Sequence, residues 1–230
     1  MKKNNLLLII TIIIIFLCLF FTLTHDNSNF LYAGSKSINN TSILIDVNAK
    51  TLYVACNKEI IKTYPVAVGL PDTPTPIGDF TIIQKDRWGE GFGSAWLGLN
   101  VPWGQYGIHG TTTPESIGYA ASHGCIRMNN IDIDDLYKTV SIGTPVKIYG
   151  GIYGLFGNGF RYIIPGDRGA DVLFVQKRLN ELGFYTGAID GIYSTELERA
   201  INRFQESEGL EITNIVDDSL YESLGIKLFE

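Results

Sequence analysis

The sequence is poor in cysteine and histidine, each of which occurs only three times in 230 residues. Neither a CxxC nor an HxxxH spacing is present, so common zinc-site patterns are missing. Basic residues are also in the minority, with 18 Lys and Arg against 24 Asp and Glu. The acidic excess lies from Gly166 onward, where 13 acidic residues face 6 basic ones. Such a segment is a poor match for nucleic acid or anionic lipid, which both need basic surfaces.

Charged residues are absent from Leu6–Leu23, an 18-residue run made mostly of Leu, Ile and Phe. That length is near the lower limit for a helix that crosses a bilayer. Two lysines precede the run and an aspartate follows it, so the positive-inside rule places the remaining chain outside the cytoplasm. A cleaved signal peptide is the alternative, although Leu31 stands where cleavage needs a small residue. We predict a membrane anchor over residues 1–24 and a flexible tether over 25–40.

A β-rich domain is predicted over residues 41–149. Apolar and polar residues alternate in three successive stretches between Thr41 and Val68, which indicates a meander of three strands. Three prolines between Gly69 and Gly78 indicate a stiff, ordered loop. Further short strands are expected at 80–84, 97–101, 106–109 and 146–149, with two minor helices that begin near Thr113 and Asn130.

After a glycine-rich linker over 150–163, the apolar period changes from two to about 3.6, which is typical of helices. One helical face is expected to carry Val172, Val175, Leu179 and Leu182. A second helix is expected to open at Thr195, with Glu198 in the relation of a capping box. We therefore predict a small all-α domain over residues 164–230.

Two residues of the β-rich domain are candidates for chemistry, His109 and Cys125. A thiol attacks carbonyl carbon as a thiolate, and histidine is the usual base that generates it. Gly124 permits the tight backbone approach that exposes a nucleophile and aims amide N–H groups at an oxyanion. Three alternatives stay open at this point. The histidines could be ordinary loop residues, both histidines and Cys125 could bind zinc, or Cys125 could form a disulfide with Cys56.

Several short motifs in order resemble the signature of the L,D-transpeptidases, the YkuD family, which remodel bacterial peptidoglycan. They are Thr75-Pro76-Ile77-Gly78-Asp79-Phe80, Ile108-His109-Gly110-Thr111, and Ser122-His123-Gly124-Cys125-Ile126-Arg127-Met128. The resemblance covers about residues 41–149. It implies a mainly β, sandwich-like catalytic fold in which Cys125 is the nucleophile and His109 its base. Neither a metal nor another cofactor is implied.

The resemblance also implies roles for the residues around this pair. The carbonyl of Gly110 would orient the imidazole, and the amides around Gly124 and Cys125 would form the oxyanion hole. We assign Arg127 to a carboxylate of the peptide stem, because a guanidinium suits that partner. His123 is ranked as a secondary, substrate-polarising residue, and Ser122 is expected to hold the loop.

The C-terminal residues resemble the helical peptidoglycan-binding domain 1 repeat. The resemblance rests on Gly166-Asp167-Arg168-Gly169-Ala170-Asp171-Val172, Gln176, Leu179, Gly183, Gly187, Asp190-Gly191 and Phe204-Gln205. Ser194 replaces the glycine that usually follows Asp-Gly-x-aromatic. Together the two resemblances imply a membrane-anchored L,D-transpeptidase on the cell-wall side, with peptidoglycan stem peptides and glycan as partners. An L,D-carboxypeptidase that uses water, or a non-catalytic wall-binding protein, are the alternatives.

Overall fold

The computed structural model of the chain describes residues 40–157 and 159–226. The predicted anchor over 1–24 and nearly all of the tether over 25–40 lie outside the described residues. Within the described ranges, no helix is long and apolar enough to cross a membrane. Two hydrophobic cores are present, one among the strands and one among the C-terminal helices. They confirm the prediction of a mainly β part followed by a helical part.

The β part is built from a sheet of eight strands, whose order is β3-β2-β1-β10-β5-β6-β7-β9. A separate two-stranded sheet pairs β4 with β8. The strands are β1 (Thr41–Asp46), β2 (Thr51–Cys56), β3 (Glu59–Pro65), β4 (Val68–Gly69), β5 (Gly78–Asp86), β6 (Trp96–Leu99), β7 (Tyr106–His109), β8 (Ala120–Ser122), β9 (Ile126–Arg127) and β10 (Pro145–Tyr149). The predicted meander is confirmed, because β1, β2 and β3 pair antiparallel in succession.

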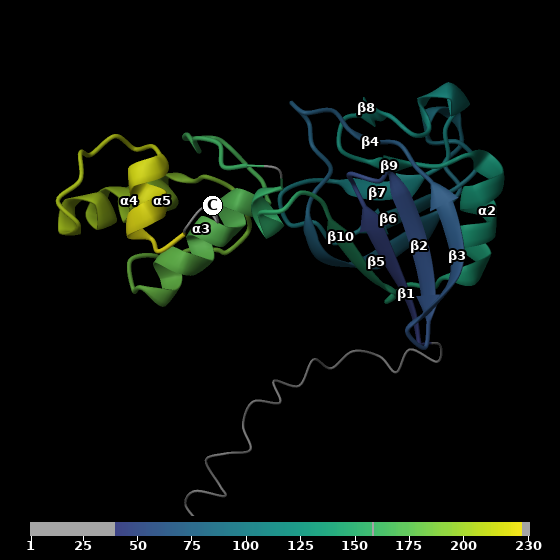
Figure 1. Cartoon of the computed structure of the whole chain (residues 1–230), viewed down its shortest axis with the longest axis horizontal. Helices are drawn as coiled ribbons and strands as arrows, with labels where there is room; N and C mark the ends of the chain where they lie inside the picture. The colour runs from purple at the N-terminus through teal and green to yellow at the C-terminus, as the bar shows by residue number, and fades with distance from the viewer. Residues whose placement is uncertain (1–39, 158, 227–230) are drawn as a thin grey trace, which may run out of the picture. The chain divides into compact units, whose positions relative to one another are not determined.

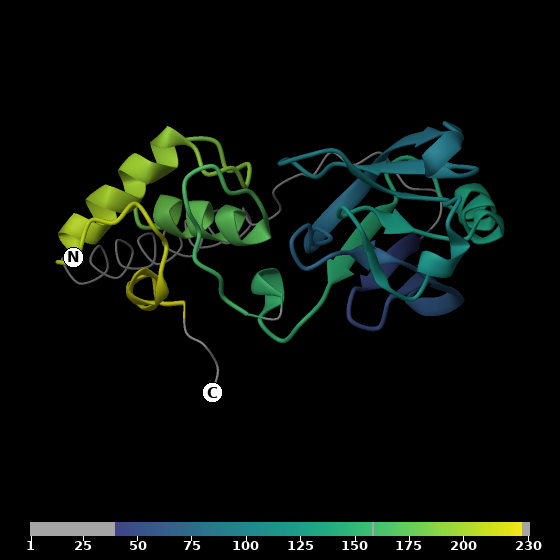
Figure 2. The same ribbon diagram turned by 90° about the horizontal axis from the view of Figure 1, so that it is seen from above.

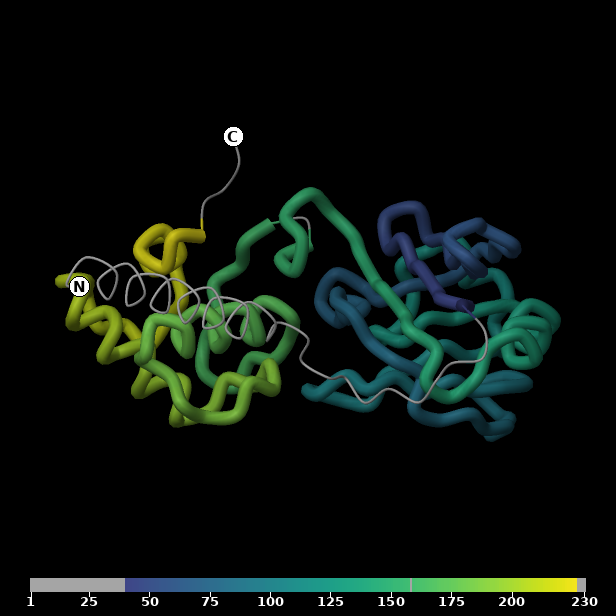
Figure 3. Tube along the Cα trace, turned by 90° about the horizontal axis from the view of Figure 1, so that it is seen from below, coloured from purple at the N-terminus to yellow at the C-terminus, as the bar shows by residue number. Residues whose placement is uncertain are grey.

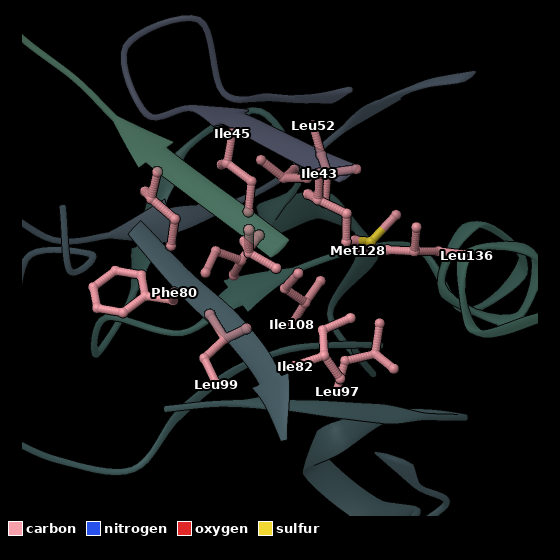
Figure 4. Packing of buried hydrophobic residues seen from close by; sticks show 14 of the residues in the cluster. Ile43, Ile45, Leu52, Phe80, Ile82, Leu97, Leu99, Ile108, Met128 and Leu136 are labelled. Atoms are coloured by element: carbon pink, nitrogen blue, oxygen red, sulfur yellow. The ribbon is translucent and has the colours of Figure 1, made fainter. Parts of the chain in front are cut away.

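Alternation within the strands explains where the β core lies. In β1, every second residue is buried, so Ile43 and Ile45 face inward while their neighbours face out. Figure 4 shows these side chains pointing toward Leu97, Leu99 and Ile108 from the other half of the same sheet. One continuous sheet therefore supplies both walls of a single core, which fits the sandwich-like arrangement expected for this part.

Helix α2 (Asn130–Thr139) covers the edge of the sheet at β3, as Figure 1 shows. Ile133 and Leu136 face the core, and Asp135 accepts hydrogen bonds from Lys62 and Tyr64 of β3. Two single-turn 3₁₀ helices complete this part, η1 (Glu90–Phe92) and η2 (Pro114–Ser116).

The C-terminal part contains α3 (Ala170–Glu181), α4 (Thr195–Ser207) and α5 (Asp218–Ser223), which are the green to yellow helices of Figure 2. Figure 3 traces the chain into this part from β10 by way of η3 (Gly154–Phe156). Two details of the prediction were wrong. Ser194, not Thr195, caps α4, because its hydroxyl accepts the N–H of Leu197. Leu182 lies past the end of α3 and is 39% exposed, so it is not part of the buried face.

Candidate active site

The two candidate catalytic residues are brought together by a parallel pairing of β7 with β9. In this pair Ile108 lies opposite Ile126, and His109 lies opposite Arg127. Cys125 immediately precedes β9, so it lies beside Gly107 of β7. The backbone amide of Met128 also donates to the His109 carbonyl at 2.8 Å. The 15 residues between His109 and Cys125 thus return the chain to the neighbouring position in the sheet.

The strand period places the two side chains on one face. Ile108 and Ile126 are both fully buried in the core. Because neighbours along a strand point to opposite faces, His109 and Arg127 point away from that core, and Cys125 does so too. The three side chains line one cavity of about 390 Å³. Ser122 and His123 line the same cavity, so the structure brings together the residues expected from the motif.

His109 is held in place from two directions. Its Nδ1 lies 2.5 Å from the carbonyl oxygen of Gly110, to which a protonated Nδ1 donates. The indole of Trp96 stacks on the imidazole at 5.7 Å between ring centroids, and Phe92 meets it edge-on at 5.1 Å. The hydrogen bond selects the tautomer whose Nε2 carries the lone pair, which is the form that can accept a thiol proton.

Burial sets the protonation state of both groups. His109 is only 4% exposed, and this burial lowers its pKa to about 4. Arg127 acts in the same direction, whereas the hydrogen bond to Gly110 opposes it. Burial also raises the pKa of the Cys125 thiol above its usual value, with the Gly107 backbone and Arg127 opposing this. At neutral pH the pair is therefore a neutral imidazole and a thiol.

No hydrogen bond between the His109 ring and Cys125 Sγ is found in the part of the chain that the structure describes. Catalytic hydrogen bonds are often long in free enzymes and tighten when substrate binds. The directions of the two pKa shifts do not favour a preformed thiolate–imidazolium pair.

This protonation state predicts how Cys125 alkylation depends on pH. Because the thiol pKa is raised and the His109 pKa is lowered to about 4, the thiolate population at pH 7 is small and grows with pH. We expect the rate of carbamidomethylation by iodoacetamide, followed by mass spectrometry, to rise throughout the range from about pH 6 to pH 9. A rate that is constant between pH 5 and pH 8 would instead indicate a preformed ion pair.

Ser122 shapes the loop that carries the nucleophile. Its hydroxyl donates to the Cys125 carbonyl at 2.5 Å and accepts the Gly124 amide at 3.1 Å. Ser122 is almost completely buried, so no solvent replaces these bonds. Gly124 between them has φ of 108°, a conformation that side-chain-bearing residues rarely adopt. The loop conformation therefore depends on Ser122 and Gly124 together.

We expect Ser122→Ala to destabilise the chain, because it leaves the buried Gly124 amide without its acceptor. The cost of such an unsatisfied group is about 1–3 kcal/mol. Thermal denaturation and the rate of Cys125 acylation should both report the change. Ser116→Ala is the matched control, since Ser116 is half-buried and its hydroxyl only donates to the Thr113 carbonyl. Equal melting temperatures for the two variants would contradict the role of Ser122.

Arg127 and His123 both line the cavity, but their surroundings differ. Arg127 makes no ion pair among the described residues, so its charge is available to a bound anion. His123 is exposed at the mouth of the loop. Farther away, Thr75 of the upstream motif is buried and accepts the Gly69 amide at 2.8 Å. That motif therefore shapes the loop beside the site.

The other expectations for the cysteines and histidines are also addressed by the structure. Cys56 and Cys125 are both free thiols, so they do not form the disulfide considered above. No group of three His, Cys, Asp or Glu side chains suited to a metal ion occurs within residues 40–157 and 159–226.

Sequence reasoning missed two residues of the site, Tyr106 and Gln105. The Tyr106 ring lies between Gly104 and Gly124, where an added Cβ would approach the ring to 2.8 and 2.6 Å respectively. Burial raises the pKa of Tyr106, and the nearby Cys125 adds to this effect. Gln105 lines the catalytic cavity. Tyr106 is placed by its contact with Gly124 and Gln105 by its position in the cavity wall, and the sequence shows neither of these contacts.

Comparison with known families gives two matches. Residues 40–148 match the YkuD model, described as the L,D-transpeptidase catalytic domain. Residues 168–224 match the model described as "Putative peptidoglycan binding domain". The first match includes His109 and Cys125, and the second includes all of α3 and α4.

Two individual relatives are named for the first of these families. "Putative L,D-transpeptidase YkuD" of Bacillus subtilis is 49% identical over 107 residues, which cover 46% of this chain and 64% of the relative. "Putative L,D-transpeptidase YqjB" of the same species is 32% identical over 122 residues, covering 46% of this chain and 69% of the relative. The catalytic domain of the Enterococcus faecium L,D-transpeptidase, solved by NMR, has 25% identity and a TM-score of 0.43, and the match covers 49% and 99% of the two chains. The chain thus spans less than two thirds of the first of these relatives.

Proposed function

The chain belongs to the L,D-transpeptidase (YkuD) family, and we propose that it forms 3→3 cross-links in peptidoglycan through an acyl-enzyme on Cys125. The observation that supports this most strongly is the shared outward face of β7 and β9. It presents His109, Cys125 and Arg127 to one cavity of about 390 Å³. A nucleophile, a base and a cation for carboxylate in one cavity are the groups that acyl transfer on a peptide stem requires.

In the first half-reaction, Cys125 Sγ attacks the carbonyl carbon of the third residue of a tetrapeptide stem. His109 Nε2 accepts the thiol proton as the S–C bond forms. The C–N bond to the terminal D-alanine then breaks, and the same proton passes to the leaving amine. The products are free D-alanine and a thioester at Cys125.

In the second half-reaction, the side-chain amine of a neighbouring stem attacks the thioester carbonyl. His109 removes a proton from this amine and returns it to Cys125 Sγ as the S–C bond breaks. The enzyme is regenerated and the two stems are joined by an amide bond. If water replaced the amine, the same steps would give an L,D-carboxypeptidase.

Both half-reactions pass through an oxyanion, which needs N–H donors. The Gly124 amide donates to Ser122 Oγ, so we assign its role to holding the loop. We assign the Cys125 amide to the oxyanion, because the positive φ of Gly124 determines the direction of that N–H. Arg127 is assigned to a stem carboxylate and His123 to polarising the substrate.

The acceptor decides between the two enzyme activities. We expect wild-type protein incubated with disaccharide-tetrapeptide to give cross-linked dimers and D-alanine, detected by mass spectrometry. Adding a high concentration of a soluble amine should divert the thioester to the amine adduct. Exclusive formation of the hydrolysed tripeptide, with and without the amine, would favour the carboxypeptidase. Sacculus binding without turnover of any stem would favour a non-catalytic wall protein.

We propose that the C-terminal helices hold the enzyme on its polymeric substrate. The proposed parts are the anchor 1–24, the tether 25–40, the catalytic domain 41–149, the linker 150–163 and the binding domain 164–230. The match to a peptidoglycan-binding model and the separate core of the helices support this division. The chain would then be a single-pass protein of the bacterial membrane, with both domains on the cell-wall side.

This division predicts the effect of ending the chain at Gly159. We expect sacculus binding to weaken about tenfold or more, because one of two linked binding elements is lost. The rate on soluble muropeptides should stay unchanged, since the β core contains almost no residue from the helices. Pulldown with purified sacculi and a soluble-substrate assay measure the two quantities. Equal sacculus retention of truncated and full-length protein would contradict the role of the helices.

A further inference from the structure

A second groove of about 390 Å³ lies beside the catalytic cavity. Trp96 and Gln105 line both spaces, and Tyr106, whose ring packs on Gly124, lines the second. The groove extends along β5, β6 and the turn between β6 and β7. A molecule bound at Cys125 could therefore continue into it without leaving the surface of the catalytic part.

Glycines face each other across β6 and β7 beneath Trp96, and one of them, Gly98, also lines the groove. Gly98 lies opposite Gly107, on the same outward face as Trp96 and His109. A Cβ on Gly98 would lie 2.9 Å from Trp96 Nε1, and one on Gly107 would lie 2.6 Å from the Trp96 ring. The indole thus lies flat across both glycines. Next to the edge of the indole, Gly98 and Gly104 have no side chains that would fill the space, and they form part of the groove lining.

The polar groups of the groove are uncharged amides. Asn100 Oδ1 accepts the Thr81 amide at 2.6 Å, and no partner for Asn100 Nδ2 is found among the described residues. The exposed Gln105 side chain also makes no hydrogen bond within the described ranges. Gln84 lines the wall but is engaged by Asp86 and Trp96. Among residues 40–157 and 159–226, no charged residue lines the groove.

We propose that this groove binds the glycan of the substrate, the uncharged N-acetylated sugar to which the donor stem is attached. The inference rests on the proposed function and adds a sugar subsite to it. Sugar hydroxyl and acetamide groups pair well with free carboxamides, and the exposed apolar side chain of Ile83 in the wall suits the apolar face of a sugar ring. A second peptide stem carries carboxylates and amines, so the uncharged lining favours sugar over peptide. The shared wall at Gln105 gives the sugar a place next to a stem held at Cys125.

The test compares full-length variants on two substrates, a disaccharide-tetrapeptide and the same N-acetylated tetrapeptide without sugar. Asn100→Asp keeps an oxygen for the Thr81 amide, replaces the free NH₂ donor by a second oxygen and adds one negative charge, a charge change that the control variant shares. We expect kcat/KM for the disaccharide substrate to fall about 3- to 10-fold, the effect of one hydrogen bond, through a higher KM. The rate on the sugar-free substrate should be unchanged. Gln105→Ala should lower the disaccharide rate by a similar factor.

Asn48→Asp is the matched control, because Asn48 is exposed in the turn after β1 and lines neither the groove nor the catalytic cavity. It should leave both rates at the wild-type value. If Asn100→Asp lowers both substrates equally, or neither, the sugar subsite is refuted.

A binding measurement keeps this test separate from the test of the proposed function. In NMR titrations of the full chain in detergent, peptide-free disaccharide should shift the side-chain amide signals of Asn100 and Gln105. If these signals shift while no stem is turned over, the sugar subsite stands and the proposed function fails. If stems are turned over and only the sugar-free peptide shifts these signals, the groove binds peptide and the inference is overturned.

Discussion

Replacing Cys125 by alanine is expected to reduce D-alanine release from a tetrapeptide stem by at least about 1,000-fold. The variant lacks the only side chain of the cavity that can form a thioester. It should also fail to form a covalent adduct with a carbapenem, which intact-mass spectrometry detects as an unchanged protein mass. The fold should survive, because Cys125 is partly exposed and its thiol contacts only the Gly107 backbone of β7, which β6 also holds in place.

Cys56→Ala is the control for general thiol chemistry. Cys56 is the other free cysteine of the described ranges and lies at the end of β2, where it pairs with Thr41 of β1. This variant should keep both the carbapenem adduct and the wild-type rate of D-alanine release. An adduct that persists in Cys125→Ala and disappears in Cys56→Ala would reverse the assignment of the nucleophile.

The second large effect is expected for His109→Gln, which should slow acylation of Cys125 by about 100- to 10,000-fold, the range for loss of a general base. Glutamine is close in size but cannot accept the thiol proton. Because the thiol pKa is raised, little thiolate forms at pH 7 without this base. The deficit relative to wild type should shrink as the pH rises, since hydroxide then replaces the base. Single-turnover rates across pH measure this.

His123→Ala separates the two histidines of the motif. His123 is exposed and no hydrogen bond of its ring is found among the described residues, whereas His109 is buried and bonded to Gly110. We expect the His123 variant to lose less than about tenfold, with the same pH dependence as wild type. A larger loss for His123→Ala than for His109→Gln would contradict the assignment of the base.

Strands β1 and β2 could be predicted from the sequence because the alternation of apolar and polar residues lies within each strand. In β1 and β2 the side chains alternate over six residues each, which is long enough for the period to be read. Strand β9 has only two residues, Ile126 and Arg127, so it has no period of its own. Its parallel register with β7, which aligns Cys125 with Gly107, depends on tertiary packing. The sequence therefore predicted which residues belong to the motifs, but not the register in which β7 and β9 pair.

The chemistry of His109 and Cys125 was predicted only in part, because it also depends on tertiary packing. Residue types made Cys125 and His109 candidates for chemistry, and the family resemblance implied that Cys125 is the nucleophile and His109 its base. The lowered pKa of His109 depends on its burial, in which Trp96 and Phe92 contact the imidazole, and no motif specifies these contacts. The Gly124 amide donates to the Ser122 hydroxyl, which leaves the Cys125 amide as our candidate donor to the oxyanion. This choice between the two amides could be made only from the structure. Likewise, Gln105 has no motif and was found only as a wall of the cavity.

The central claim is that a peptide stem is transferred through a thioester at Cys125. The most direct test is to mix full-length protein with a disaccharide-tetrapeptide, quench in acid within the first turnover, and map the modified peptide by mass spectrometry. We predict an adduct equal to the donor without its terminal D-alanine, located on Cys125. The absence of any adduct while D-alanine is still released, or an adduct on another residue, would contradict the claim.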